Sequence, residues 1–332
     1  MKFAFQGAKS MIKGVTLILT YRCTNQCRHC CYGAAPNRNT LMKVEEVRDY
    51  LQELSKIQLP EWVCIFGGET LLYPGLLFNV IDEVKKFEVP RVSVITNGFW
   101  GKDEQLAKKY VKNLKNAGLN LLILSVDAFH QEFIPLETVK TVLRVAEDVK
   151  IEDIEVDAKV LGNFEEQNVY NERTKALLEE IQEEFNVKID VKSVHLYGRA
   201  AYELARYLPS KGIPEDKCSS LHYYGTLKEP TGIEIEPNGW VWICTGIAIG
   251  NAKTDALSRI LQKYDYNKNP IIKIVVDEGP AGLLKLAAEK GYEPLKGYAD
   301  KCHLCFETRK FLRPYYPDVL VVDNCYQNVT AI

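Results

Sequence analysis

Three cysteines near the start of the chain have a spacing that can hold an iron-sulfur cluster. Cys23, Cys27 and Cys30 form a C-x3-C-x2-C run. Three thiolates can hold three irons of a cubane 4Fe-4S cluster, and the fourth iron then keeps open coordination sites. A closed structural site would have four protein ligands. The spacing favours a catalytic cluster, and the alternatives are a three-cysteine zinc site or a set of redox thiols.

An iron with open sites can bind a small molecule that offers an amine and a carboxylate, such as the methionine end of S-adenosylmethionine (SAM). One-electron reduction then cleaves SAM to a 5'-deoxyadenosyl radical. The cysteine run also follows the first predicted strand directly, and in parallel barrels the loops after strands build the active site. Both points favour catalysis over a zinc site or redox thiols.

The chain around this run alternates between short apolar segments and segments of helical period. We predict strands over residues 15–21, 62–66, 92–96, 121–126, 154–161 and 189–197, and helices near residues 43–57, 75–88, 103–117, 135–148 and 169–186. Strict alternation requires a parallel sheet, and right-handed crossovers curl it into a barrel. Because six units fall short of a complete barrel, we expect an α/β fold built on a partial (β/α)6 TIM-like barrel.

Glycines and polar residues stand at the ends of the next three predicted strands. These segments are Gly67-Gly68-Glu69, Thr96-Asn97-Gly98 and Ser125-Val126-Asp127. In a barrel the strand ends lie on one face, where the active site is built. Paired glycines let backbone atoms approach a ligand closely, and Glu69 can accept charge-assisted hydrogen bonds from an ammonium group. The sequence therefore predicts a ligand site beside the cysteine run.

The strand-helix rhythm changes after Arg199. Residues 231–244 alternate apolar and polar side chains around Pro237-Asn238-Gly239, which predicts a β-hairpin with an Asn-Gly turn. Helices are expected near residues 253–264 and 279–291. Four further cysteines bracket these elements, and four thiolates complete the coordination of a 4Fe-4S cluster. The predicted ligands of this second cluster are Cys218, Cys244, Cys302 and Cys305.

Other cysteines and histidines have less defined roles. Cys325 is a fifth candidate ligand, but it could also donate a hydrogen atom near the substrate or simply lie buried. Cys31 and Cys64 are expected to pack rather than bind metal. His130 is placed either near the active site or against the following helix.

Composition excludes several classes of partner. The 42 basic residues nearly cancel the 44 acidic ones, so no excess positive charge favours nucleic acid or an anionic membrane. The longest apolar runs, such as residues 121–126, fall far short of the roughly 20 residues that cross a bilayer. The N-terminus lacks the apolar stretch of a signal peptide. Ten cysteines without an export signal indicate metal ligation in a reducing, cytoplasmic compartment.

The cysteine run, the Gly-Gly-Glu segment and the strand end Tyr197-Gly198-Arg199-Ala200 resemble the radical SAM superfamily over residues 15–200. The resemblance implies that the cysteine run binds a 4Fe-4S cluster and that Gly67, Gly68 and Glu69 hold the methionyl amine. It also implies SAM contacts, with Ser125 on the ribose or carboxylate side and His29 and Tyr32 beside the adenine. By the same resemblance, Thr96, Asn97 and Asp127 serve either SAM or substrate.

Residues 201–332 are similar to the twitch domain of radical SAM enzymes, the shorter relative of the SPASM domain, which implies one auxiliary 4Fe-4S cluster. Residues 1–14 are expected to be an N-terminal extension. We therefore expect no fused leader-peptide-binding domain, so a peptide substrate would need a partner protein or direct recognition by the barrel. The segments around His29, Asn97 and Ser125 also look like those of radical SAM peptide epimerases. Those enzymes carry a hydrogen-donating cysteine directly after the hairpin cysteine, where this sequence has Thr245.

The resemblance implies a radical SAM enzyme that abstracts a hydrogen atom from a substrate. We expect a peptide substrate, with oxidation, crosslinking or epimerisation as the outcome. The alternatives are a twitch-type small-molecule dehydrogenase or cofactor-pathway enzyme, and a non-enzymatic iron-sulfur or zinc protein. An electron donor such as flavodoxin or ferredoxin is implied. The residues expected to act on the substrate are Asp127, His130, Arg199 and Cys325.

Overall fold

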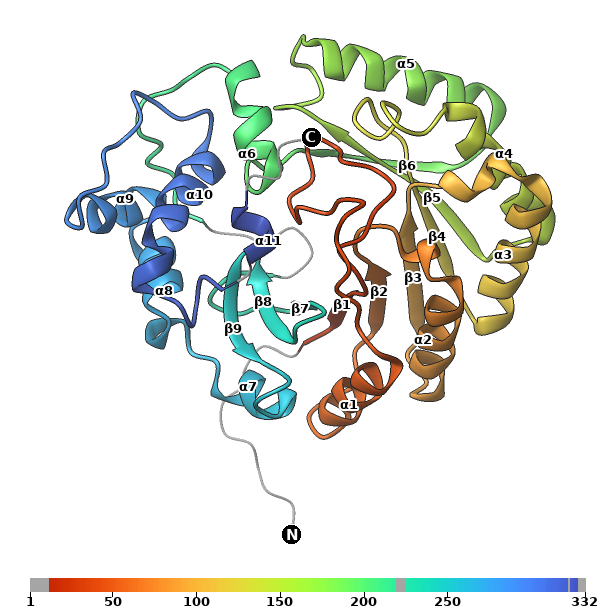
Figure 1. Cartoon of the computed structure of the whole chain (residues 1–332), viewed down its shortest axis with the longest axis horizontal. Helices are drawn as coiled ribbons and strands as arrows, with labels where there is room; N and C mark the ends of the chain where they lie inside the picture. The colour runs from red at the N-terminus through yellow and green to blue at the C-terminus, as the bar shows by residue number, and fades with distance from the viewer. Residues whose placement is uncertain (1–11, 219–224, 322, 328–332) are drawn as a thin grey trace.

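The computed structural model describes residues 12–218, 225–321 and 323–327. Most of the predicted extension over residues 1–14 lies outside the described residues. The first half of the chain forms a curved parallel sheet with helices on its outer side (Figure 1). Its strands are β1 (Gly14–Ile18), β2 (Trp62–Phe66), β3 (Arg91–Thr96), β4 (Leu121–Ser125), β5 (Asp153–Val160) and β6 (Lys188–Ser193).

The helices between these strands are α1 (Val44–Ser55), α2 (Pro74–Lys86), α3 (Glu104–Ala117), α4 (Leu136–Val149) and α5 (Val169–Glu184). Each strand of this part pairs in parallel with the next along the chain. The predicted partial (β/α)6 barrel is therefore confirmed. The strand and helix bounds differ from the predicted ones by a few residues, most at the end of β6, which stops at Ser193.

Local sequence explains where the helices begin and end. The Asp103 side chain accepts hydrogen bonds from the backbone N–H groups of Gln105 and Leu106 at 2.9 and 3.0 Å, and this N-cap starts α3. Gly118 follows the same helix in the left-handed conformation, at φ 99°, and ends it. Apolar side chains of the helices and of the outer face of the sheet form one buried core. This core fixes the strands whose ends carry the predicted site.

The predicted hairpin is confirmed, and it extends the same sheet. Strand β7 (Gly232–Ile235) pairs in parallel with β1, and β8 (Trp240–Cys244) pairs antiparallel with β7. A further strand, β9 (Ile247–Asn251), was not predicted. The nine described strands run in the order β6-β5-β4-β3-β2-β1-β7-β8-β9. The hairpin that carries Cys244 therefore lies beside the strand that leads into the first cysteine run.

The remaining helices are α6 (Arg199–Glu203), α7 (Leu257–Lys263), α8 (Pro270–Asp277), α9 (Pro280–Ala288), α10 (Lys301–Leu312) and α11 (Asp323–Tyr326). Helices α8, α9 and α10 gather on the side of the molecule away from α2, α3 and α4 (Figure 1). The sequence predicted α7 and α9 but neither α8 nor α10. Within the described part of the chain, no helix combines the length and the apolar character that crossing a membrane requires.

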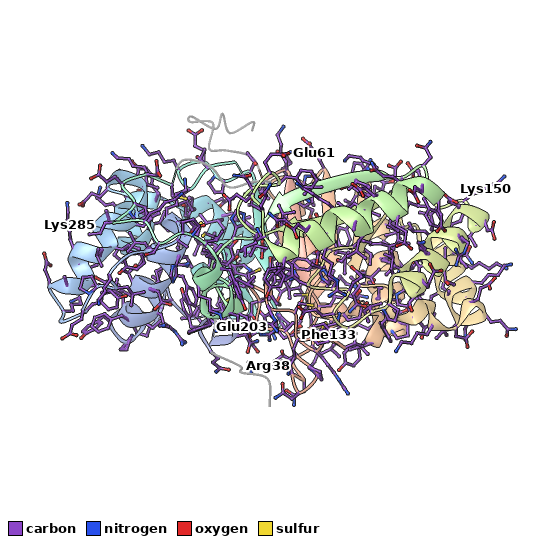
Figure 2. The ribbon with its side chains drawn as sticks, turned by 90° about the horizontal axis from the view of Figure 1, so that it is seen from above. Arg38, Glu61, Phe133, Lys150, Glu203 and Lys285 are labelled. Carbon is purple, nitrogen blue, oxygen red and sulfur yellow. The ribbon has the colours of Figure 1, made fainter. Side chains whose placement is uncertain are left out.

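Loops that follow the strands gather on one side of the molecule. Arg38, Phe133 and Glu203 come after β1, β4 and β6, and Figure 2 shows them on the side opposite Glu61, which precedes β2. The first cysteine run also lies in a loop after a strand. The carboxyl ends of the strands therefore position the candidate site.

Candidate cluster and cofactor site

The first cysteine run lies in the loop between β1 and α1. Cys23 and Cys27 are buried, and Cys30 is partly exposed. The Cys23 sulfur accepts a hydrogen bond from the backbone N–H of Asn25 at 3.4 Å, and the Asn97 amide nitrogen lies 3.9 Å from it. Burial raises the pKa of the free Cys23 thiol to about 12. A thiol in this position stays protonated unless a metal replaces the proton.

Arg199, which was predicted to act on the substrate, begins α6 and binds this loop. Its guanidinium is buried and donates hydrogen bonds to the carbonyl oxygens of Cys27 at 3.0 Å and Ala34 at 2.8 Å. Its backbone N–H donates to the Cys30 carbonyl at 3.1 Å. Gly198 precedes it at φ 62°, and a Cβ there would lie 2.4 Å from the Cys31 carbonyl oxygen. Arg199 therefore fixes the shape of the cysteine loop.

The glycine pair at the end of β2 packs against the chain that leads into Cys23. A Cβ on Gly67 would lie 2.3 Å from the Thr20 carbonyl oxygen, and one on Gly68 would lie 2.0 Å from that of Arg22. The backbone N–H of Glu69 donates to the same Arg22 oxygen at 2.8 Å. Only glycine allows this approach. The pair therefore sets Glu69 beside the first cysteine.

The Glu69 carboxylate is fully buried and joins two strand ends. It accepts hydrogen bonds from the Leu71 N–H at 3.0 Å, the Thr96 hydroxyl at 2.9 Å and the Asn97 N–H at 2.8 Å. Asn97 in turn donates from its side chain to the Thr24 hydroxyl at 3.0 Å. Burial raises the pKa of Glu69 to about 6, although these hydrogen bonds lower it. A carboxylate has about four acceptor positions, so Glu69 retains capacity for one more donor.

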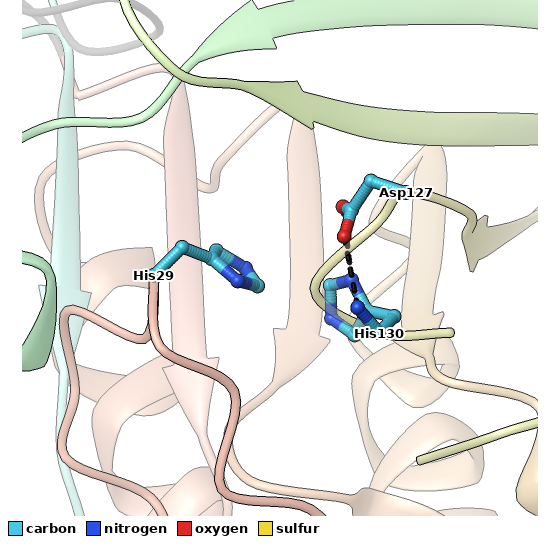
Figure 3. A group of neighbouring side chains, drawn as sticks. All are labelled: His29, Asp127 and His130. Carbon is cyan, nitrogen blue, oxygen red and sulfur yellow. Dashed lines mark hydrogen bonds and ion pairs between the residues drawn. The ribbon is translucent and has the colours of Figure 1, made fainter. Parts of the chain in front are cut away.

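A second polar group, Asp127 with His130, lies beside His29 of the cysteine loop (Figure 3). Asp127 is fully buried, and its oxygens accept hydrogen bonds from the N–H groups of Phe129 and His130 at 3.0 Å and of Lys159 at 3.1 Å. Its Oδ2 also lies 2.9 Å from His130 Nδ1. Burial opposes ionisation, but His130 and the N–H donors hold the pKa of Asp127 below its usual range. Asp127 thereby orients the His130 ring.

The His29 ring projects from the cysteine loop toward this pair (Figure 3). Its centroid lies 4.8 Å from that of His130 and 4.9 Å from that of Phe129. Its Nδ1 is buried, with no hydrogen-bond partner among the described residues. Burial lowers the pKa of His29 to about 3, so the ring is neutral. A neutral, flat side chain is suited to packing against another flat ring.

The structure places Tyr32 beside β7 and Ser125 at the end of β4. The Tyr32 hydroxyl donates to the Glu234 carboxylate on β7 at 3.1 Å, and its ring lies 5.0 Å from that of Phe66. Ser125 is buried at the end of β4, in register with Asp157 of β5. Tyr32 thus lies in the loop after β1 and Ser125 ends β4, and their contacts with SAM stay predictions.

Charged side chains on β5, β6 and β7 were missed by the sequence analysis. Lys159 and Lys192 both form ion pairs with the buried Asp157. The buried Glu234 stands on β7 and binds Tyr32. A usable signal was present, because residues 153–160 read Asp-Ile-Glu-Val-Asp-Ala-Lys-Val, a strand with one charged face. On a barrel strand, that face lines the interior.

The structure brings the second set of cysteines together around the hairpin and α10. Cys244 ends β8, and Cys302 and Cys305 lie in the first turns of α10. The pKa of Cys302 is raised by burial, by Asp300 and by the Cys305, Cys244 and Cys218 thiols. These thiols therefore lie near enough to Cys302 to disfavour its ionisation.

Cys325 is buried near the loop that carries the first cysteine run. Burial raises its pKa, and among the neighbours that affect it are Arg309, Glu234 and Cys30. The backbone before it is tightly packed, since a Cβ on Gly33 would lie 2.3 Å from the Asn324 carbonyl oxygen. Cys325 is therefore positioned between the two cysteine groups, close to the loop that holds Cys30.

Comparisons with known proteins agree with this geometry. Residues 17–166 match the radical SAM superfamily. The chain is 22% identical over 317 residues to the putative peptide biosynthesis protein YydG of Bacillus subtilis (strain 168), covering 92% of this chain and 95% of that protein. It is 27% identical over 162 residues to a probable GTP 3',8-cyclase of Methanococcus aeolicus, covering 46% of this chain and 52% of the cyclase.

Among solved structures, native anSMEcpe with bound AdoMet superposes with a TM-score of 0.53 at 14% identity, covering 95% of this chain and all of that chain. This similarity extends the shared fold across the C-terminal half. The superfamily uses SAM and a 4Fe-4S cluster, and a three-cysteine loop of the expected spacing lies inside the matched residues. The chain therefore contains a radical SAM domain over residues 17–166, and the protein is an enzyme.

Proposed function

We propose that this enzyme removes a hydrogen atom from a peptide substrate bound at the open side of its barrel. The observation that carries the proposal is the similarity to a putative peptide biosynthesis protein over 92% of the chain. The cluster, when bound, supplies the electron that cleaves SAM to methionine and the 5'-deoxyadenosyl radical. That radical takes the hydrogen atom and becomes 5'-deoxyadenosine.

The ligand region offers a group for each part of SAM. Cys23, Cys27 and Cys30 would hold the cluster. The Glu69 carboxylate, with its remaining acceptor capacity, would bind the ammonium group of the methionine end. His29, neutral and held beside Phe129, would pack against the adenine. Gly67, Gly68, Thr96, Asn97, Ser125 and Tyr32 would complete the SAM site.

Two of the residues expected to act on the substrate, Arg199 and Asp127, have positioning roles in this proposal. Arg199 holds the cysteine loop through two carbonyl oxygens. Asp127 orients His130, and His130 lies where it can contact the adenosyl group or the substrate.

Exposed apolar side chains near the site favour the binding of a large substrate such as a peptide. Phe133 follows β4 and is 42% exposed, and the exposed residues Leu41, Phe164 and Tyr207 follow β1, β5 and β6. Figure 2 shows Phe133 on the side of the molecule opposite Glu61, which precedes β2. Exposed apolar and aromatic residues around a polar site are typical of surfaces that bind peptides or proteins.

We also propose that residues 201–332 form a twitch-like domain with one auxiliary 4Fe-4S cluster on Cys218, Cys244, Cys302 and Cys305. Their mutual charge effects support a common site. Among the described residues no trio of cysteine sulfurs lies mutually within 4.8 Å, as the ligands of one metal ion would. A cubane, whose ligands bind different irons, needs wider spacing.

The auxiliary cluster favours an oxidative outcome. After the first hydrogen atom leaves, the substrate radical would pass one electron to this cluster and release one proton, and the product would lack two hydrogens. Thr245, which follows Cys244, has no thiol that could return a hydrogen atom. The proposed external partner is a small electron donor of the flavodoxin or ferredoxin type, acting in the cytoplasm.

Epimerisation is a second candidate because of where Cys325 lies. Its thiol is buried toward the Cys30 loop, so it could return a hydrogen atom to the substrate radical. The resulting thiyl radical would then need one electron and one proton to regenerate the thiol. This route leaves the mass of the product unchanged in ordinary water.

Mass spectrometry of the modified peptide separates these outcomes. The enzyme, reconstituted anaerobically, would be incubated with SAM, a reductant and the short peptides encoded beside its gene, in water and in deuterium oxide. Loss of two hydrogens in water supports oxidation or crosslinking. One added mass unit only in deuterium oxide supports epimerisation. No change in any peptide, while a small molecule is oxidised, would contradict the peptide proposal.

A further inference from the structure

We infer that Arg309 is the buried counter-charge of the auxiliary cluster and raises its reduction potential. This inference rests on the ligand set proposed above, Cys218, Cys244, Cys302 and Cys305. A raised reduction potential would make the auxiliary cluster an electron acceptor. The ligand set alone does not specify whether the cluster accepts or donates electrons. Arg309 would act through the cluster, as a positioning residue, without touching the substrate.

Arg309 bridges the two segments that carry three of the four cysteines. It lies in α10, one turn after Cys305, and its side chain is 1% exposed. Its Nε donates a hydrogen bond to the Cys305 carbonyl at 3.3 Å, and its Nη1 donates to the Thr245 carbonyl at 2.7 Å. Thr245 follows Cys244 directly. The guanidinium therefore lies between the end of the hairpin and the cysteine-bearing turn of the helix.

Aromatic packing holds this arrangement in place. The Arg309 guanidinium carbon lies 5.8 Å from the centre of the Tyr326 ring. The Tyr326 hydroxyl donates to the Gly246 carbonyl at 2.9 Å, and its ring stacks on Phe306 at 5.6 Å. These contacts fix the turn after Cys244 as well as the cation.

The charge of Arg309 lacks an acidic partner. Among the side chains that the structure describes, no carboxylate lies within ion-pair distance of it. The ionisable groups that interact with its charge include Tyr326 and the thiols of Cys305, Cys244, Cys325 and Cys218. A guanidinium does not give up its proton in proteins, and a buried charge without a counter-charge is costly by several kcal/mol.

Metal binding would supply the missing negative charge. Cysteines that ligate a metal are thiolates, and a cubane held by four thiolates carries net negative charge in both of its common oxidation states. A fixed cation beside such a group stabilises the more negative, reduced state. Arg309 would therefore raise the reduction potential and make the cluster a better acceptor for the electron of a substrate radical.

The test measures the auxiliary cluster by itself. In full-length protein carrying Cys23→Ala, Cys27→Ala and Cys30→Ala, only the auxiliary cluster remains, and its midpoint potential can be followed by electron paramagnetic resonance during a redox titration. Arg309→Gln should lower the potential. Arg309→Lys, which keeps the charge, should shift it less.

Arg313→Gln is the matched control. Arg313 lies 4.9 Å from the same Tyr326 ring but is only partly buried, and its removal should leave the potential unchanged. An unchanged potential in Arg309→Gln, or an equal shift in Arg309→Lys, would overturn the inference.

If Arg309→Gln binds no iron, retention of the cluster by Arg309→Lys supports a charge role for Arg309, and loss of the cluster in Arg309→Lys opposes that role. If the triple alanine protein itself holds no iron, the ligand set fails, and SAM cleavage by the unmodified enzyme remains a separate measurement.

Discussion

The Glu69 carboxylate accepts a hydrogen bond from the backbone N–H of Asn97 at 2.8 Å. This contact ties the end of β2 to the end of β3, and Asn97 reaches on to Thr24 in the cysteine loop. One buried acid thus joins three loops that the sequence separates by dozens of residues. We propose that the same acid receives the ammonium group of SAM.

SAM affinity should therefore fall as pH decreases through about 6, the raised pKa of Glu69. Above that pH the carboxylate is ionised and attracts the ammonium group. Below it, protonation removes the negative charge, because burial has moved the pKa upward. Equilibrium binding of SAM to the reconstituted enzyme between pH 5 and 8, with iron content checked at each pH, measures the effect. Glu69→Gln should bind SAM weakly with no step near pH 6, and an unchanged step in that variant would assign the titration elsewhere.

Gly68→Ala should destabilise the site. The added Cβ would lie 2.0 Å from the Arg22 carbonyl oxygen, so backbone must shift, which costs about 1–3 kcal/mol. Thermal unfolding and iron content should both decrease. Gly75→Ala is the matched control, because a Cβ there meets nothing within 4 Å. Equal stability of the two variants would contradict the close approach of β2 to the cysteine loop.

Phe133→Ser should weaken binding of the peptide substrate. The residue is 42% exposed on the carboxyl-end face, and the loss of an apolar contact of this kind lowers affinity by about 1–3 kcal/mol. KM for the peptide should rise more than kcat falls. Ile57→Ser, 44% exposed in the loop before β2, should leave both constants unchanged. A similar rise in KM for both variants would remove support for this docking face.

Cys325→Ala separates the two proposed outcomes. If the enzyme oxidises its substrate, this variant should still give a product that lacks two hydrogens, since the thiol takes no part. If Cys325 returns a hydrogen atom, the deuterium label incorporated from deuterium oxide should disappear. Cys64→Ala, in the middle of β2, is the control for removing a thiol. Retention of the label in Cys325→Ala would exclude this cysteine as the donor.

Much of the fold could be predicted because the strand-helix rhythm is local. Each strand of the partial barrel was found, and so was the hairpin at Asn238-Gly239. Helix α8 was missed because its sequence, PIIKIVVD, is rich in β-branched residues that favour strands. It forms a helix because Asn269 caps its start, accepting hydrogen bonds from Ile271 and Ile272, and Pro270 occupies its first turn.

The candidate site was predictable where spacing alone defines chemistry, as in the cysteine run. Contacts between residues that lie far apart in the sequence could not be predicted from spacing. Arg199 was expected to act on substrate, but its guanidinium is directed at the Cys27 and Ala34 carbonyls. Nothing in the sequence distinguishes Arg309 from the other basic residues, because α10 was not predicted. Its burial becomes visible only when α10 is placed against the turn after Cys244.

Formation of 5'-deoxyadenosine is the most direct test of the account. Anaerobically reconstituted enzyme with SAM and dithionite should produce it. The variant with Cys23→Ala, Cys27→Ala and Cys30→Ala should produce none, while remaining folded and retaining roughly half of its iron in the auxiliary cluster. Cys64→Ala should behave like the unmodified enzyme. Undiminished 5'-deoxyadenosine formation by the triple variant would contradict the assignment of the catalytic cluster to this loop.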